Sequence, residues 1–420
     1  MNYMKKRILG VIKLLSFILL LYICLFIIWN VTKAKESYID REDFNNQEEE
    51  FDVLFLGSSH VKWGISPMEL WRDYGIVSYN LGTGGETIPV SYWSMRLALK
   101  QTNPKLIVID SYMVSSNKKY DTEKTHKSLD SFPVSFAKFQ AVYDIFETEN
   151  LIDYMMNYIF NFSIYHSRWD ELEKADFKKD INYQKGANLQ QGVTAHDINT
   201  DFETVSIYND KETIGMEYLR KIIEYCQKKK IDVLVAMMPY PANNTEIGQS
   251  KYIKQICDEY NVNYVNFLKD KEIVNDSTDY RDQHGHLNAS GARKVTKYLG
   301  KYIMENYNIP DQRKNEAYSF WNKDLNEYID YKIQRLKANN KDLQKYLMLL
   351  YDDDFKFDIK IKSTVKIEEG STLSELLKNL NNDYEIDDTA FKNAKDKNIK
   401  ITVYDKRDNK KIDEVYFKYE

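Results

Sequence analysis

Residue types that build disulfide frameworks, zinc sites and flexible linkers are scarce in this chain. Its 420 residues include three cysteines, Cys24, Cys226 and Cys257, whose number and spacing fit neither a disulfide framework nor a zinc-binding pattern. With only 7 prolines and 15 glycines, the composition excludes long flexible linkers and favours a compact, helix-rich chain. Basic residues are not in excess, because the formal net charge is -5, so we expect no nucleic-acid partner.

One long apolar run occupies residues 8–29 and satisfies the length of about 20 residues that a membrane-spanning helix needs. Basic residues 5–7 precede it and an acidic stretch, 36–43, follows it, which predicts a cytoplasmic N-terminus and an extracytoplasmic remainder at the cell membrane. A cleaved signal peptide is the alternative, but its apolar region would be shorter, and no small-x-small cleavage site follows Trp29. We therefore expect an uncleaved, single-pass anchor.

Residues 51–67, FDVLFLGSSHVKWGISP, predict a strand, a turn and the start of a helix. The apolar run 51–56 is typical of a strand buried on both faces, and Gly57 ends it ahead of two serines and a histidine. Ser66 and Pro67 then provide an N-cap and a first helical residue. This is the layout in which an α/β protein presents a nucleophile at the carboxyl edge of its sheet.

Strand and helix patterns alternate along the chain with short connections. Helical stretches separate five apolar runs, which we predict as strands at 51–56, 76–82, 105–113, 231–239 and 262–267. Such alternation is typical of a parallel sheet, so we expect a three-layer α/β/α, flavodoxin-like domain with a parallel five-stranded sheet. Residues 114–210 interrupt the alternation, and we predict an insertion there that lies over the carboxyl edge of the sheet, where substrate-shaping segments usually lie.

The pattern changes after residue 310. Residues 315–350 are helical in pattern, whereas the alternating stretches at 357–367 and 398–420 are typical of half-exposed antiparallel strands. We expect a small α+β domain there, with no residue cluster that suggests chemistry. The predicted organisation is a cytoplasmic tip and transmembrane anchor (1–32), a stalk (33–50), the α/β domain (51–310), a helical connector (311–349) and the small α+β domain (350–420).

Three segments follow strands of the predicted sheet and therefore meet at its carboxyl edge. They are GSSH at 57–60, NLGTGGET at 80–87 and DQHGHLNASGA at 282–292. Together they resemble the sequence blocks of the SGNH (GDSL-type) hydrolase superfamily, in the same order and on the same element ends. The resemblance covers roughly residues 51–305 without the insertion, and it implies the SGNH fold and acyl-ester chemistry.

The resemblance implies that Ser59 is a nucleophile and His286 its general base. A serine hydroxyl is a poor nucleophile at neutral pH unless a base takes its proton, and the pKa of histidine suits that task. A carboxylate would fix the imidazole tautomer. Asp282 is the best candidate, although it stands four residues before His286 where the family has three; Asp279 is the reserve.

The resemblance also implies an oxyanion site and a substrate site. It points to the backbone N–H groups of Ser59 and Gly85 as oxyanion donors, which act where negative charge develops in acyl transfer. Asn80, Gly82 and His60 are expected to bind substrate, with His60 in the wall of the pocket.

The third oxyanion donor of the family is an asparagine after the third strand, and here the sequence at 109–112 is Ile-Asp-Ser-Tyr. This departure indicates a likeness to divergent, membrane-associated relatives, namely the DltD family of teichoic acid D-alanylation and the alginate O-acetylation proteins. The likeness implies an esterase or O-acyltransferase that acts on an acylated envelope polysaccharide or teichoic acid. It also implies a membrane-bound O-acyltransferase as partner.

Other interpretations remain open from the sequence. Ser58 and Ser59 also suit a helix N-terminus, and a degenerate site would make this an accessory protein that binds a glycan or an acyltransferase without catalysis. Asp282, His284 and His286 alternate as metal ligands do, but no other His or Cys ligand lies near the remaining strand ends, so we expect no metal and no cofactor. Three histidines of the insertion are expected at the surface: His126, His166 and His196.

Overall fold

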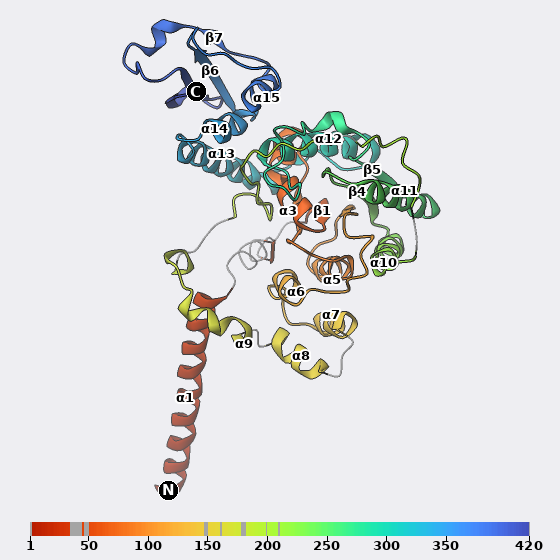
Figure 1. Ribbon diagram of the computed structural model, residues 1–420. Helices are drawn as coiled ribbons and strands as arrows, with labels where there is room; N and C mark the ends of the chain where they lie inside the picture. Colours follow the sequence, from red (N-terminus) through yellow and green to blue (C-terminus); the bar gives the residue numbers. More distant parts are fainter. Residues whose placement is uncertain are drawn as a thin grey trace.

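The structure is a computed structural model that describes residues 2–33, 44–45, 50–146, 150–159, 162–177, 182–198, 200–208 and 211–419 (Figure 1). The predicted stalk falls mostly outside these residues, as do short parts of the insertion. Helix α1 (Asn2–Thr32) projects away from the body of the protein (Figure 1). Among the described residues it contains the one helix segment, Lys6–Thr32, that is long and apolar enough to cross a membrane. The apolar run predicted as a spanning helix is therefore helical.

A five-stranded, all-parallel sheet with the order β2-β1-β3-β4-β5 forms the centre of the body. This confirms the predicted α/β class. The strands are shorter than predicted; they are β1 (Val53–Leu56), β2 (Ser78–Asn80), β3 (Leu106–Asp110), β4 (Asp232–Met237) and β5 (Asn263–Asn266).

Helices cover both faces of this sheet, which gives the predicted three layers. Leu54 and Leu56 of β1 belong to a core cluster that also includes residues of α5, α10 and α11, while Val53 and Phe55 belong to a second cluster with residues of α12. Successive strand residues point to opposite faces, so each face of β1 has its own helical layer. The helices are α5 (Ile88–Ala98), α10 (Ile214–Lys229), α11 (Asn244–Glu259) and α12 (Ala289–Asn306).

Two helices, not one, follow β1. The short α3 (Ser59–Gly64) was not predicted, because six residues are too few to show helical periodicity. Helix α4 (Pro67–Tyr74) begins as predicted, with Ser66 accepting a hydrogen bond from the N–H of Glu69 and Pro67 in the first turn. Helix α4 then packs against α12.

The insertion lies mainly beside α5 and α1 instead of over the carboxyl edge. Its helix α7 packs on α5 and α8, whereas α9, η1 and η2 pack against α1 (Figure 1). Two parts reach the site: α6, which brings Lys124 against Gly85, and the segment 182–198. The elements are α6 (Thr122–Leu129), α7 (Phe136–Phe146), α8 (Leu151–Ile159), α9 (Phe162–Tyr165), η1 (His166–Asp170) and η2 (Lys174–Phe177).

The C-terminal region has a second sheet with the order β7-β6-β8-β9 and its own core. Strands β6, β8 and β9 pair antiparallel, as the alternating pattern predicted, and the two-residue β7 adds a parallel edge. The elements are α13 (Phe320–Ala338), α14 (Leu343–Leu350), β6 (Phe355–Ile361), α15 (Thr372–Asn379), β7 (Glu385–Ile386), β8 (Ile399–Asp405) and β9 (Lys410–Phe417).

A buried ionic cluster joins α12 to this C-terminal region. Arg293 of α12 pairs with Asp352 at 2.8 Å and with Glu69 of α4 at 3.0 Å, and Lys332 of α13 pairs with Asp352 at 2.8 Å. Burial acts against the charge on Asp352, but the positive charges of Arg293 and Lys332 hold its pKa well below the usual range. Removing one partner of such a buried pair typically costs about 3–5 kcal/mol of stability. Lys294 adds a hydrogen bond to Asn379 of α15 at 3.1 Å.

Candidate active site

Ser59 is the first residue of α3, directly after the end of β1. Ser58 caps α3 by accepting a hydrogen bond from the N–H of His60, so the N-cap role that the sequence left open for the two serines belongs to Ser58. The hydroxyl of Ser59 is therefore free to act elsewhere, and its Oγ lies 2.9 Å from Nε2 of His286. A nucleophile and a base at hydrogen-bond distance are the first requirement of serine catalysis.

His286 is oriented in turn by Asp282. The Nδ1 atom of His286 lies 2.9 Å from Oδ2 of Asp282, and the backbone N–H groups of His284 and His286 donate to Oδ1 of the same carboxylate at 3.0 and 3.3 Å. Arg281 donates from Nε to Oδ2 at 2.9 Å. Ser59, His286 and Asp282 thus form a continuous hydroxyl–imidazole–carboxylate chain, the arrangement in which a carboxylate fixes the tautomer of a catalytic base.

The extra residue between Asp282 and His286 is absorbed by a tight turn. The N–H of Gly285 donates to the carbonyl of Asp282 at 3.1 Å, and the N–H of Arg281 donates to the carbonyl of His286 at 2.8 Å. Gly285 has φ of 75°, and a Cβ there would come within 2.1 Å of Cδ of Pro241, so the turn requires glycine. The reserve candidate Asp279 is fully buried and bonds Ser290 and Lys294 instead.

The pKa shifts of His286 and Asp282 favour a neutral imidazole and an ionised carboxylate. Burial lowers the pKa of His286, and the hydrogen bond to Asp282 opposes this only in part. Burial pushes the pKa of Asp282 up, but the hydrogen bond and charge of His286 and the charge of Arg281 outweigh it, so the pKa of Asp282 lies below its usual value. At neutral pH the imidazole is neutral and the carboxylate ionised, which is the state that can accept the proton of Ser59.

The two predicted oxyanion donors are backbone N–H groups that have no partner in the described protein. Among the described residues, the N–H groups of Ser59 and Gly85 form no hydrogen bond with the protein. Gly85 is exposed, has φ of 72° and lies in a turn closed by the N–H of Glu86 and the carbonyl of Thr83 at 3.0 Å. These two backbone donors remain the candidates for stabilising negative charge.

Asn80 and Gly82 support α3 from behind. The amide of Asn80 donates to the carbonyls of Val61 and Ile65 at 2.8 and 2.9 Å, and its Oδ1 accepts from the N–H of Gly82 at 2.9 Å. Asn80 is 1% exposed and Gly82 is buried, so in this structure both residues fix the helix that carries Ser59. Their expected contact with substrate stays a prediction.

His60 belongs to an aromatic wall under the imidazole of His286. Its ring centroid lies 5.0 Å from that of His286, 4.2 Å from Tyr112 and 5.6 Å from Tyr240. Burial, and then the proximity of His286, lower the pKa of His60 to about 3. The ring is therefore neutral at physiological pH and has a packing role in the wall of the site.

Trp63 and Arg281 contact the site and were missed from the sequence. The ring of Trp63 meets that of His286 edge-on, with centroids 4.4 Å apart and an interplanar angle of 88°. The guanidinium of Arg281 lies 3.9 Å over the Trp63 ring while it pairs with Asp282. Trp63 follows Ser59 by four residues and so lies on the same face of α3. A prediction of α3 would therefore have placed Trp63 beside the site.

Asp110, at the end of β3, stands beside the place where the SGNH family has its asparagine. Its Oδ2 accepts a hydrogen bond from Ser58 at 3.3 Å and its Oδ1 from the N–H of Tyr112 at 3.2 Å. Burial raises the pKa of Asp110 to about 7, although these hydrogen bonds oppose the shift. Gly57 makes this approach possible, because a Cβ there would come within 2.7 Å of Cβ of Asp110.

Two of the three insertion histidines differ from the surface location expected for them. His166 is exposed, but His196 is half-buried and its Nε2 lies 3.0 Å from the carbonyl oxygen of Asp282. His126 is only 3% exposed, because α6 turns it inward against the ring of Tyr158. Its Nδ1 lies 2.9 Å from Oδ1 of Asp130.

The metal interpretation finds no support in the geometry. Both ring nitrogens of His286 already face protein atoms, in Ser59 and Asp282. Within the described part of the chain, no three His, Cys, Asp or Glu side chains are placed to hold a metal ion together.

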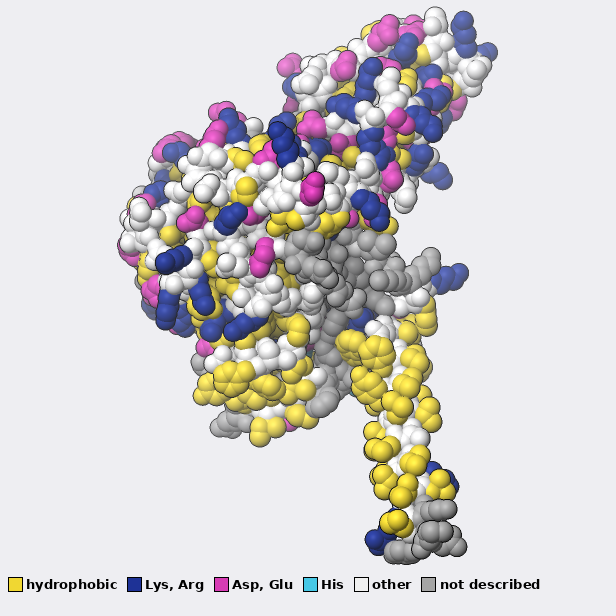
Figure 2. All heavy atoms as spheres, turned by 180° about the vertical axis from the view of Figure 1, so that it is seen from behind, with side chains coloured by type: hydrophobic (Ala, Val, Ile, Leu, Met, Phe, Trp, Pro, Cys, Tyr) yellow, Lys and Arg dark blue, Asp and Glu magenta, His cyan; other side chains and the backbone are white. Residues whose placement is uncertain are grey.

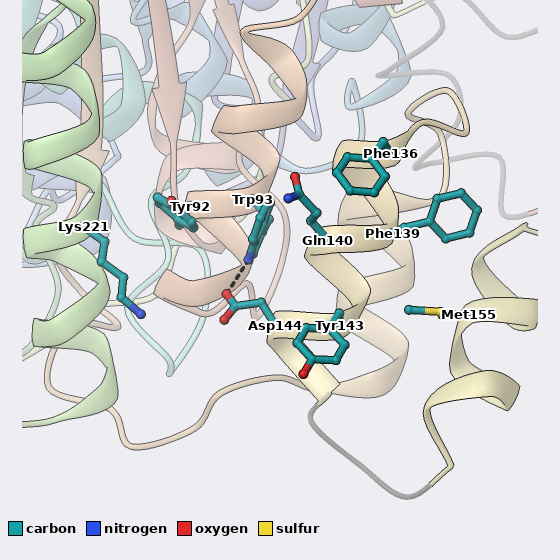
Figure 3. Close-up of a pocket in the computed structure, with 9 residues that line it drawn as sticks. All are labelled: Tyr92, Trp93, Phe136, Phe139, Gln140, Tyr143, Asp144, Met155 and Lys221. Carbon is teal, nitrogen blue, oxygen red and sulfur yellow. Dashed lines mark hydrogen bonds between the residues drawn. The ribbon is translucent and has the colours of Figure 1, made fainter.

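A recess of about 460 Å³ lies elsewhere, between α5, α7, α8 and α10 (Figure 3). Its lining is mostly aromatic, and Trp93 donates from Nε1 to Asp144 at 2.6 Å. None of the residues of the Ser59 site lines it, so it is a separate feature of the insertion.

Comparisons with known proteins give weak likenesses. No family model matches the chain, and no curated protein matches it. Among solved structures, a lipolytic protein of the G-D-S-L family from Desulfitobacterium hafniense is 12% identical, with a TM-score of 0.31 over 59% of this chain and 97% of that one. A GDSL-like lipase from Bacteroides thetaiotaomicron is also 12% identical, with a TM-score of 0.31 over 64% and 98%. An acylhydrolase from Bacteroides fragilis is 11% identical, with the same TM-score over 64% and 94%. Likenesses this weak support no conclusion about this chain by themselves.

Proposed function

We propose that the chain is a serine-dependent acyl esterase or O-acyltransferase of the SGNH type, with Ser59, His286 and Asp282 as its catalytic residues. The observation that carries the proposal is the 2.9 Å distance between Ser59 Oγ and His286 Nε2, with Asp282 on the other nitrogen of the ring. Residues 227 positions apart in the sequence meet in the geometry that activates a hydroxyl.

In this proposal His286 takes the proton of Ser59 as the hydroxyl oxygen attacks an acyl carbonyl. The N–H groups of Ser59 and Gly85 donate to the oxyanion, and each such donor is typically worth about 10²–10³ in rate. His286 then gives the proton to the departing alcohol, which leaves an acyl ester on Ser59. Water or a polymer hydroxyl, deprotonated by His286, releases the acyl group and restores the serine.

The proposed substrate is an acylated envelope polysaccharide or a teichoic acid outside the membrane, with a membrane-bound O-acyltransferase as partner. Two features support this: the apolar helix α1, which would anchor the chain, and the sequence likeness to DltD and the alginate O-acetylation proteins. The orientation with the site outside follows from the basic residues before the apolar run and the acidic stretch after it.

A second candidate is a non-catalytic protein that binds a glycan or an acyltransferase. Asp110 favours it, because residues 109–112, where the family has an asparagine, contain a carboxylate and no amide side chain. An ionised Asp110 would repel a developing oxyanion, whereas a protonated one would not.

A fluorophosphonate probe distinguishes the two candidates. We expect the full-length protein in detergent to take up one probe per chain, detected as a mass increase on the peptide that contains Ser59. Ser59→Ala should abolish the modification, while Ser58→Ala, a change at the adjacent serine, should retain it. An unmodified wild-type protein would favour the non-catalytic candidate, and modification of the Ser59→Ala protein would remove Ser59 from the mechanism.

A further inference from the structure

The insertion exposes an unusual concentration of large apolar side chains. Outside α1, eleven large apolar residues are exposed among those described, and seven of them lie between positions 134 and 177. We call these seven the insertion face; they are Val134, Phe136, Tyr143, Ile152, Met156, Trp169 and Phe177. Scattered apolar residues are normal at a surface, but a contiguous group marks a site of contact.

Helix α7 is apolar on two sides. Its inner side buries Ala141, Val142 and Ile145, while its outer side presents Phe136, which is 77% exposed, and Tyr143. Apolar side chains that leave the buried side of a helix and face outward form a surface that a contact would cover. Helix α8 continues this surface with Ile152 and Met156, which stand one turn apart.

The insertion face is tied to the C-terminal end of α1. Arg168 donates from Nη1 to the carbonyls of Thr32 and Lys33 at 2.7 and 2.8 Å, and so caps the last turn of α1. Its Nη2 pairs with Asp176 at 3.1 Å, which joins η1 and η2 to the same cap. Trp169, the residue after Arg168, is 71% exposed, and Trp is enriched where helices leave a bilayer.

Figures 1 and 2 place these features together. Helices α7 to α9 lie at the end of the body from which α1 projects (Figure 1). Seen from behind, a broad hydrophobic area covers this end of the body beside α1, whereas charged side chains are spread over the opposite end (Figure 2). The aromatic recess of Figure 3 adjoins the insertion face, because Phe136 and Tyr143 line it as well.

We propose that the insertion face rests in the interface of the bilayer that α1 crosses, at the C-terminal end of α1. A bilayer that covers the exposed apolar side chains of α1 extends to about Trp29, close to the cap formed by Arg168. Interfacial segments bury apolar side chains at the boundary between headgroups and acyl chains, and lipid is the apolar phase nearest to this surface. The chain would then contact the membrane twice, and the second contact sets how the body lies on it.

Site-specific fluorescence in the full-length protein tests this proposal. Cys24 is replaced by serine; Cys226 and Cys257 are buried, and burial raises the pKa of each thiol to about 12, so they react poorly. Single cysteines Ile152→Cys and Met156→Cys are labelled with an NBD fluorophore, and the protein is placed in phosphatidylcholine–phosphatidylglycerol nanodiscs. The matched control is Ile386→Cys, at an apolar residue that is 55% exposed in the C-terminal sheet.

We expect a lipid carrying a nitroxide near its headgroup to quench NBD at 152 and 156 severalfold more than at 386, and aqueous iodide to do the reverse. Equal quenching by iodide at all three positions would overturn the proposal, because the insertion face would then be in water although a bilayer is present. A label-free check uses Trp169 in a Trp29→Phe background: brominated lipid should quench fluorescence that disappears with Trp169→Phe. No such difference would also overturn the proposal.

Discussion

The molecule contains two histidine–aspartate pairs of the same spacing and length in two different regions. His286 and Asp282 pair at 2.9 Å at the carboxyl edge of the sheet, and His126 and Asp130 pair at 2.9 Å in the insertion. The first pair is accessible, with side chains 15% and 28% exposed, whereas those of the second are 4% and 0% exposed. A His–Asp hydrogen bond therefore does not by itself mark a catalytic site.

What differs is the group that the second ring nitrogen faces. Nε2 of His286 meets the hydroxyl of Ser59, whereas Nε2 of His126 is buried and has no hydrogen-bond partner among the residues that the structure describes. The ring of His126 stacks on Tyr158 with centroids 4.0 Å apart, and Asp130 accepts a hydrogen bond from Tyr165. In the proposed function the first pair moves a proton, whereas the second pair holds helices of the insertion together.

Replacing each histidine should separate these roles most strongly. We expect His286→Gln to lower kcat for a generic acyl ester by about 10²–10⁴-fold, the usual contribution of a general base. His126→Gln should leave kcat unchanged and lower stability by about 1–3 kcal/mol, because it disturbs a buried hydrogen bond. Ester turnover and urea midpoints of both variants provide the measurements. Full activity of the His286 variant would contradict the proposed mechanism.

Replacing Asp282 and Asp130 should separate the roles of the two pairs in the same way. Asp282→Asn should lower kcat by about 10²-fold or more, because an amide no longer holds the imidazole in the tautomer that accepts the proton of Ser59. Asp130→Asn should affect the urea midpoint alone. If Asp282→Asn left kcat intact, the carboxylate would have only a structural role.

The pH dependence of kcat/KM tests the pKa of His286. Because burial lowers the pKa of His286, kcat/KM should fall only as pH drops through a value below the usual imidazole pKa of about 6.5. The charge of Arg281 contributes to this lowering, so Arg281→Ala should shift the acid limb to higher pH. An acid limb that stays in place would show that the charge of Arg281 does not contribute to this pKa.

The smallest expected effect concerns Asp110. Its pKa in the folded protein is raised to about 7, so its contribution to stability is fully present below the unfolded pKa of about 4 and is lost as pH rises through 7. Asp110→Asn should reduce the difference between urea midpoints at pH 5 and pH 8. An unchanged difference would mean that Asp110 does not titrate in this interval.

The elements that could be predicted from the sequence are those with a strong local pattern. The apolar runs gave the parallel sheet, and the order of the strands placed Ser59, His286 and Asp282 at one edge, where the structure has them. Helix α3 could not be predicted because its six residues show no periodicity, and Trp63 was missed with it. His126 was wrongly predicted at the surface, because the helix TEKTHKSL is mostly polar. In the fold its ring stacks on that of Tyr158, which lies far from it in the sequence.

Helix α12 connects the turn that carries His286 to the C-terminal region. Asn288, two residues after His286, caps its start and also bonds the carbonyls of Gly192 and Thr278. About one turn further along α12, Arg293 pairs with Asp352 and Lys294 donates a hydrogen bond to Asn379, both in the C-terminal region. Because α12 is one continuous helix from Ala289 to Asn306, a shift of the C-terminal region would reach the turn that carries His286 through a single element.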